Sequence, residues 1–186
     1  IVRVAWNDPV IIKPILDLAP AGIVVPMIRS AEEALQAVQA CRYPPEGQRG
    51  FGPMRNMYGI ESMEEYLAVA EEQILVFVQI EHIDAVNDLD AILATPGLDG
   101  IVLGRNDLSG SMGKLGQHSD PEVQEAINTV FAKARQTDLF IGVSIGYDLE
   151  IVKEWRPKGV HFFSLGGDVD YFFDTAKAVA DEVHAL

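Results

Sequence analysis

Two carboxylates, Glu81 and Asp107, stand at the carboxyl ends of the strongly apolar runs 74–81 and 100–107. Such runs are typical of strands in a parallel sheet that is buried on both faces. In (β/α) folds, the carboxyl ends of the strands form the mouth of the active site. Two carboxylates at that mouth could hold a divalent metal through oxygen ligands and leave positions for water and substrate.

Side chains alternate between two faces along the run 74–81. The aliphatic face suits a layer of helices and carries Val76, Val78 and Ile80. The opposite face ends in Gln79 and Glu81 and should line the interior of a barrel near its mouth. A buried carboxylate is costly without a partner, and a cation would supply one. The alternative is that Glu81 caps a helix beginning near Asp84, and spacing alone leaves both readings open.

Asp107 belongs to the stretch Gly-Arg-Asn-Asp-Leu-Ser at 104–109. Gly104 permits close backbone approach, and the N–H groups of residues 105–107 could bind a carboxylate. The alternative is an Asp that serves a turn or a helix cap. The four histidines are not spaced as a metal cluster, and His118 is expected in a surface loop.

Arg3 lies within the otherwise apolar run 1–6, where Val2, Val4 and Trp6 indicate a core strand. Arginine is rarely buried without a partner. If the metal site exists, we expect Arg3 to face the same mouth and to stabilise negative charge on a substrate oxygen. The alternative is an arginine on an edge strand that points to solvent.

The composition limits the functional classes. Fourteen basic and 28 acidic residues give a net charge of −14, which argues against nucleic-acid and anionic-membrane surfaces. A local arginine and a metal could still favour an anionic substrate. The single cysteine, Cys41, suits a reducing cytoplasm and is interpreted as a small helix residue. No apolar run approaches the length of a membrane span.

Strands and helices alternate along the whole chain. Strands are predicted near 1–6, 22–28, 74–81, 100–105, 139–145 and 160–166. Helices are predicted near 8–18, 30–41, 61–72, 84–94, 121–137, 147–156 and 169–185. Asp8-Pro9, Ser30, Ser62 and Asp120-Pro121 are helix-start signals. Strict βαβα order predicts one parallel sheet.

The predicted architecture is a TIM-type (β/α)8 barrel in a single domain, 1–186. Because a barrel has eight strands and six are predicted here, we expect the first two βα units to be missing from this chain. An open doubly wound sheet is the alternative, but no G-x-G-x-x-G follows the first strand.

The segment 42–60 is long and irregular, with three prolines, four glycines and three arginines. Long loops in compact domains are usually functional or disordered. It should start on the amino-terminal side of the barrel and would have to cross to reach the mouth. A lid, a subunit contact and a plain surface excursion are the alternatives.

At this point the chain resembles the class II, metal-dependent pyruvate aldolases of the 4-hydroxy-2-oxoheptanedioate and 2-dehydro-3-deoxyglucarate aldolase group. The stretches that carry the resemblance follow one another in the family's order: 3–9, 25–27, 42–50, 78–81, 97–101, 104–109 and 112–116. The remainder of the chain fits the family's last barrel strands more loosely.

The resemblance implies a barrel that binds Mg²⁺, Mn²⁺ or Co²⁺ through Glu81 and Asp107. It implies that Gln79 lines the pyruvate site and that Arg3 contacts the keto oxygen and stabilises the enolate. Backbone N–H groups around Asn106 and Asp107 would hold the pyruvate carboxylate. It also implies assembly as a homotrimer or homohexamer, with a helix exchanged between subunits.

Three departures from the family pattern stand out. The family's Asp-Gly-Glu-His stretch is absent from this sequence. Arg105 replaces the usual proline, and Ser144 lies where an aliphatic residue often lines the pyruvate pocket, which suggests an altered acceptor or reaction.

We therefore predict a metal-dependent lyase that cleaves or forms 4-hydroxy-2-oxo acids from a 2-oxo acid and an aldehyde. Within enzymes, the alternative is a citryl-CoA-type lyase or an oxaloacetate decarboxylase on the same metal site. Outside enzymes, it is a non-catalytic barrel that binds 2-oxo acids.

Overall fold

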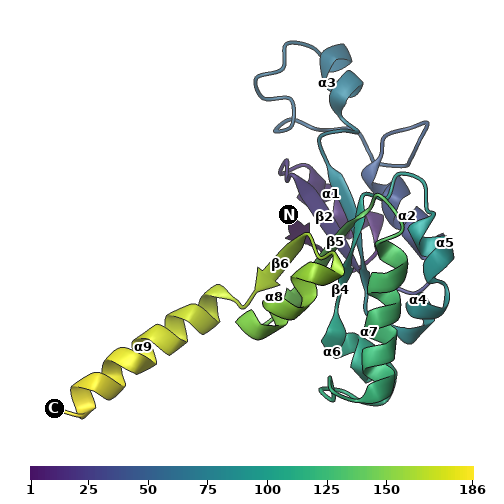
Figure 1. The fold of residues 1–186 in the computed structure, drawn as a ribbon. Coiled ribbons are helices and arrows are strands. Elements are labelled where there is room, and N and C mark those ends of the chain that lie inside the picture. Colours follow the sequence, from purple (N-terminus) through teal and green to yellow (C-terminus); the bar gives the residue numbers. More distant parts are fainter.

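Six parallel strands form one sheet in the order β1-β2-β3-β4-β5-β6 in the computed structural model, which describes residues 1–186 (Figure 1). The strands are β1 Val2–Arg3, β2 Gly22–Ile28, β3 Leu75–Ile80, β4 Gly100–Leu103, β5 Phe140–Ile145 and β6 Phe162–Leu165. The predicted parallel α/β architecture is confirmed as a half-barrel of six strands.

Helices connect the strands, and several begin at the predicted caps. They are α1 Pro9–Leu16, α2 Ala31–Cys41, α3 Met63–Val69, α4 Ile83–Asn87, α5 Leu89–Leu93, α6 Arg105–Ser111, α7 Pro121–Ala134, α8 Leu149–Trp155, the 3-10 turn η1 Arg156–Lys158, and α9 Asp168–His184. The hydroxyls of Ser30 and Ser62 accept the N–H groups of Glu33 and Glu65, which satisfies donors that an α-helix start leaves free.

The helix predicted over 84–94 is divided into α4 and α5 at Asp88. The Asp88 backbone departs from helical geometry, with φ −100° and ψ 15°. Its carboxylate accepts the N–H of Ala31, the first residue of α2, at 2.8 Å. A long-range hydrogen bond therefore ties the break to a neighbouring helix.

The first strand is shorter and more exposed than predicted. Only Val2 and Arg3 pair with β2, and of the apolar residues that indicated a core strand only Val4 is buried. Val2 and Trp6 are 38% and 54% exposed. The reason is that β1 lies at the edge of the sheet, with a partner strand on one side only.

The two faces of the sheet have different surroundings. One face packs against the helices in a cluster of 35 buried residues that includes Val76, Val78 and Ile80. The concave face carries a smaller cluster of Val24, Phe77 and Val102, against which Leu75 and Phe162 pack. The predicted alternation along β3 is confirmed.

The segment 42–60 is anchored near the amino-terminal ends of the strands. Arg42 donates to the carbonyl oxygens of Ile74 and Gly97, which precede β3 and β4, at 3.1 and 3.3 Å. The buried Arg49 pairs with Asp17 at 3.1 Å, beyond the end of α1. These contacts hold the segment at the end of the sheet opposite to Glu81, so they favour a surface excursion over a lid.

Helix α9 extends away from the rest of the fold and has no buried residue (Figure 1). No helix in the chain combines the length and the apolar character needed to cross a membrane. Cys41 ends α2 and is buried as a free thiol. Burial raises the pKa of this thiol to about 12, so it stays protonated at neutral pH and has a packing role.

Candidate active site

Glu81 is a buried carboxylate with one unsatisfied oxygen. It directly follows β3 and is 1% exposed. Its Oε1 accepts the Met27 N–H at 2.8 Å, while Oε2 has no hydrogen-bond partner. A buried charged oxygen without a partner is unfavourable, so this position suits a bound cation.

The Met27 N–H reaches Glu81 because β2 is irregular at this point. The pairing of β2 with β3 shifts between Val25 and Ile28, and Met27 has a φ of +58°. Left-handed backbone is unfavourable for a residue with a side chain, and such geometry clusters at functional sites. Sequence reasoning missed this contact, although Pro26 inside a strand is a signal of a bulge.

The capping alternative for Glu81 is wrong. Helix α4 begins at Ile83, and its cap is His82, whose Nδ1 accepts the Asp84 N–H at 3.1 Å. Glu81 points instead to the concave side of the sheet, where it reaches Met27 of the neighbouring strand. Its carboxylate is therefore available to the mouth.

Asp107 lies in the first turn of α6 and is exposed next to Glu81. Burial raises the pKa of Glu81, and the neighbouring carboxylate of Asp107 raises it further, while the Met27 N–H and Arg3 act in the opposite direction. Two adjacent carboxylates match the oxygen ligands that hard divalent cations prefer. No third His, Cys, Asp or Glu joins them, so water and substrate would supply the remaining ligands.

Gly104 allows the side chains of Glu81 and Gln79 to lie against the backbone that follows β4. A Cβ atom at position 104 would lie 2.7 Å from Glu81 Oε2 and 2.8 Å from Gln79 Nε2. Both distances are shorter than side chains tolerate, so any substitution would displace Glu81 or Gln79. The glycine thereby fixes where the unpaired oxygen can lie.

We expect Gly104→Ala to weaken divalent-ion binding by roughly 10- to 100-fold, the usual effect of disturbing groups that orient a metal ligand. Titration calorimetry with Mn²⁺ measures the change. Gly146→Ala is the matched control, because a Cβ there meets nothing within 4 Å. Unchanged affinity in Gly104→Ala would show that Glu81 does not bind the ion.

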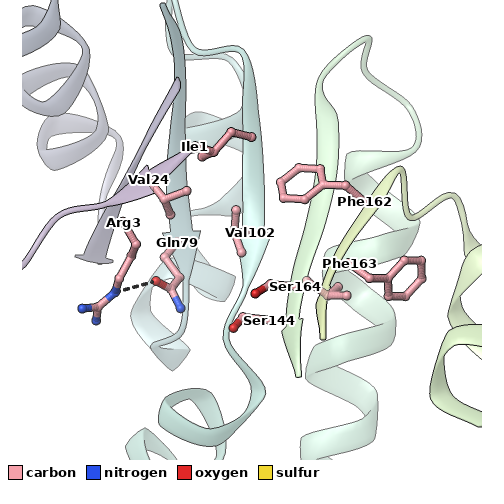
Figure 2. A pocket seen from close by; sticks show the side chains of 10 residues that line it. Ile1, Arg3, Val24, Gln79, Val102, Ser144, Phe162, Phe163 and Ser164 are labelled. Carbon is pink, nitrogen blue, oxygen red and sulfur yellow. Dashed lines mark hydrogen bonds between the residues drawn. The ribbon is translucent and has the colours of Figure 1, made fainter. Parts of the chain in front are cut away.

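A cavity of about 280 Å³ opens on the concave face, and it is lined by Gln79, which lies two positions before Glu81 on the same face of β3. Arg3, Gln79 and Ser144 all line it, so the structure brings together three of the predicted site residues (Figure 2). Arg3 Nε donates to Gln79 Oε1 at 3.5 Å, which ties the guanidinium of β1 to the side chain of β3 (Figure 2). Phe162 and Ser164 of β6 also line the cavity, and sequence reasoning had not singled them out.

Asn106 does not line this cavity, and its side chain contacts His118. Its Oδ1 lies 2.7 Å from His118 Nε2. Burial, followed by the charge of Arg105, lowers the pKa of His118, which favours the neutral imidazole at pH 7. The predicted contribution of Asn106 to substrate binding would therefore come from its backbone N–H. The contact with His118 was missed because it spans 12 residues, from α6 into the following loop, and leaves no periodic signal.

The sequence profile of the HpcH/HpaI aldolase/citrate lyase family matches residues 1–175. The chain belongs to the HpcH/HpaI aldolase/citrate lyase family. A 5-keto-4-deoxy-D-glucarate aldolase of Citrobacter koseri is 38% identical to it over 185 residues, 97% of this chain and 70% of the relative. The predicted class, a carbon–carbon lyase of aldolase type, is confirmed at this level.

Solved structures of similar proteins agree with this fold. A family member from Burkholderia cenocepacia superposes with a TM-score of 0.89 at 30% identity, covering 98% of this chain and 73% of that one. The citrate synthase SbnG superposes with a TM-score of 0.80 at 28% identity, covering 94% and 67%. Enzymes with different names therefore share closely similar folds.

Proposed function

We propose that this HpcH/HpaI chain is a metal-dependent aldolase that forms or cleaves 4-hydroxy-2-oxo acids through the enolate of pyruvate. The observation that carries the proposal is the buried, unpaired Oε2 of Glu81 beside Asp107. The relatives named 5-keto-4-deoxy-D-glucarate aldolase support a substrate derived from a sugar acid. Aldolase is favoured over citrate synthase because the aldolase relative is 38% identical and the citrate synthase 28%.

Glu81 and Asp107 would hold the divalent ion, which is Mg²⁺, Mn²⁺ or Co²⁺ in this proposal. When bound, such an ion supplies Lewis acidity toward the oxygens of a 2-oxo acid. Arg3 donates to the keto oxygen, which gains negative charge as the enolate forms. Gln79 accepts from Arg3 Nε and keeps the guanidinium oriented. Ser144 lines the same cavity and contacts the substrate.

The first turn of α6 adds N–H donors. The N–H groups of Arg105, Asn106 and Asp107 precede the first intrahelical bond, in which Leu108 donates to Gly104. In the proposal these donors receive the substrate carboxylate.

Proton exchange at the pyruvate methyl group tests the proposal, because it needs no aldehyde. The protein is incubated with pyruvate in D₂O and each candidate ion, and loss of the methyl signal is followed by NMR. Ion-dependent exchange is expected, and it would also separate an enzyme from a barrel that only binds 2-oxo acids. Absence of exchange with all three ions would refute the proposed chemistry.

We also propose that the six strands belong to a single-domain, eight-stranded barrel and that the protein is a homotrimer or homohexamer. The barrel is supported by the TM-score of 0.89 with a chain of which 73% is covered. Assembly is supported by α9, which has no buried residue and exposes Phe172 and Phe173 by 78% and 63%.

Helix α9 should therefore be required for assembly. Phe172→Asp should shift the molar mass in light scattering from that of the oligomer to that of a single subunit, because a charge would have to be buried in the contact. Asp181→Asn, on the same helix, is the control for a change of charge. An unchanged mass in Phe172→Asp would place the subunit contact elsewhere.

A further inference from the structure

The carboxylate of Glu81 shares one level of the sheet with two serines. Three residues are paired at one level across β3, β4 and β5: Ile80, Leu103 and Val143. One position further along each strand are Glu81, Gly104 and Ser144, and the Gly104 N–H still donates to the β3 carbonyl at 3.1 Å. Ser144 is in turn paired with Ser164 of β6. Glu81, Gly104, Ser144 and Ser164 thus form one row across four neighbouring strands.

Both serine hydroxyls are free in the structure. Ser144 and Ser164 are exposed to the cavity and make no hydrogen bond within the chain. Elsewhere, the hydroxyls of Ser109 and Ser111 donate to carbonyl oxygens of their own helix. Figure 2 shows the two free hydroxyls side by side, on the side of the cavity that faces Gln79.

The interior side chains one level below the two serines are not polar. On β5 and β6 the preceding interior positions are Gly142 and Phe162, and the Phe162 ring covers the glycine. Barrel interiors are usually filled by bulky apolar side chains. Here the apolar filling stops one level below the mouth, and the last level of both strands is polar.

The row also separates the serines from the position of the 2-oxo acid. Neighbouring strands are about 4.8 Å apart, so Ser144 lies roughly 10 Å from Glu81 along the row. Gly104, between them, contributes no side chain, and the side chains of Glu81 and Gln79 lie against its backbone. A three-carbon acid held beside Glu81 is too short to reach Ser164. The serines therefore face the part of the substrate that derives from the aldehyde.

We propose that Ser144 and Ser164 form a polar subsite that binds hydroxyl groups of the aldehyde and selects hydroxylated aldehydes over unsubstituted ones. This inference rests on the proposed aldolase function. A serine hydroxyl both donates and accepts, as does a substrate hydroxyl. A carboxylate group on the aldehyde would need a cationic partner. The only cationic side chain that lines the cavity is Arg3, which is assigned to the keto oxygen, so the subsite favours hydroxyl groups.

The selectivity of aldol addition to pyruvate tests the subsite. Glyceraldehyde and propionaldehyde have the same number of carbons and differ in hydroxyl groups. For wild-type protein we expect a higher kcat/KM with glyceraldehyde. Ser144→Ala and Ser164→Ala should each reduce the ratio of the two kcat/KM values by roughly 3- to 10-fold, the range for one hydrogen bond between uncharged groups. The double variant should reduce it further.

Two further variants make the test specific. Ser164→Thr keeps the hydroxyl and should recover most of the ratio. Thr129→Ala removes a hydroxyl on helix α7 that donates to the Glu125 carbonyl, and it should leave the ratio unchanged. A wild-type ratio in the double alanine variant would overturn the subsite, as would an equal loss with both aldehydes.

Proton exchange into pyruvate by the wild-type protein distinguishes a failure of the aldehyde subsite from a failure of the aldolase proposal. Exchange with unaltered aldehyde selectivity in the double variant refutes the subsite alone. If the wild-type protein exchanges no protons, the aldolase proposal fails, and the aldehyde subsite fails with it.

Discussion

Arg3→Ala should slow the exchange of pyruvate methyl protons by about 10²–10³-fold, the range for losing one donor to a developing oxyanion. Arg3 lines the cavity and donates only to Gln79, through Nε, so its terminal nitrogens are free for a substrate oxygen. The enolate oxygen carries more negative charge than the ketone. The donor therefore favours the transition state over bound pyruvate, and pyruvate binding should weaken only modestly.

Arg3→Lys should recover part of the lost rate, because an ammonium keeps the charge but not the planar fork of donors. Exchange is measured by NMR at saturating pyruvate and metal. Arg156→Ala, at an exposed arginine beyond α8, is the control and should behave as wild type. If Arg3→Ala exchanges at the wild-type rate, Arg3 has no part in the chemistry and is an edge-strand residue.

Glu81→Ala and Asp107→Ala should each abolish measurable binding of divalent ions while the fold remains intact. Each change removes one of the two carboxylates, and a single carboxylate with water makes a poor site for these ions. The loss should exceed the roughly 10- to 100-fold that follows from disturbing outer-shell groups. Titration calorimetry or the electron paramagnetic resonance signal of free Mn²⁺ measures it.

Glu81→Gln refines this test because glutamine can still accept the Met27 N–H through its carbonyl oxygen. The variant should fold as wild type and still bind the ion poorly. Glu72→Ala, an exposed carboxylate before the other end of β3, is the control. Full activity of either alanine variant at trace metal would remove the carboxylate pair from the site.

The alternation of side chains allowed the concave face of the sheet to be predicted from local sequence. Phe77 and Gln79 lie on that face because neighbouring side chains in a strand must point to opposite sides. The capping serines were likewise predictable, since Ser30 and Ser62 interact with residues three positions away. Both signals operate within one element.

Features that depend on contacts between elements left no such signal. The break at Asp88 depends on Ala31, which lies 57 residues away. Ser164 could not be matched with Ser144 until the register of β5 and β6 was known. The exposure of Trp6 depends on β1 being at the edge of the sheet, and an apolar run alone does not distinguish an edge strand from a central one.

The contacts that anchor segment 42–60 stabilise the fold at a place far from the candidate active site. Arg42 and Arg49 hold the segment near the amino-terminal ends of the strands, at the opposite end of the sheet from Glu81. No proposed substrate group takes part in these contacts. Substitutions at the mouth that lower stability can be offset by strengthening this distant edge. Substitutions on β5 and β6 that change the preferred aldehyde can therefore accumulate during evolution while the protein remains folded.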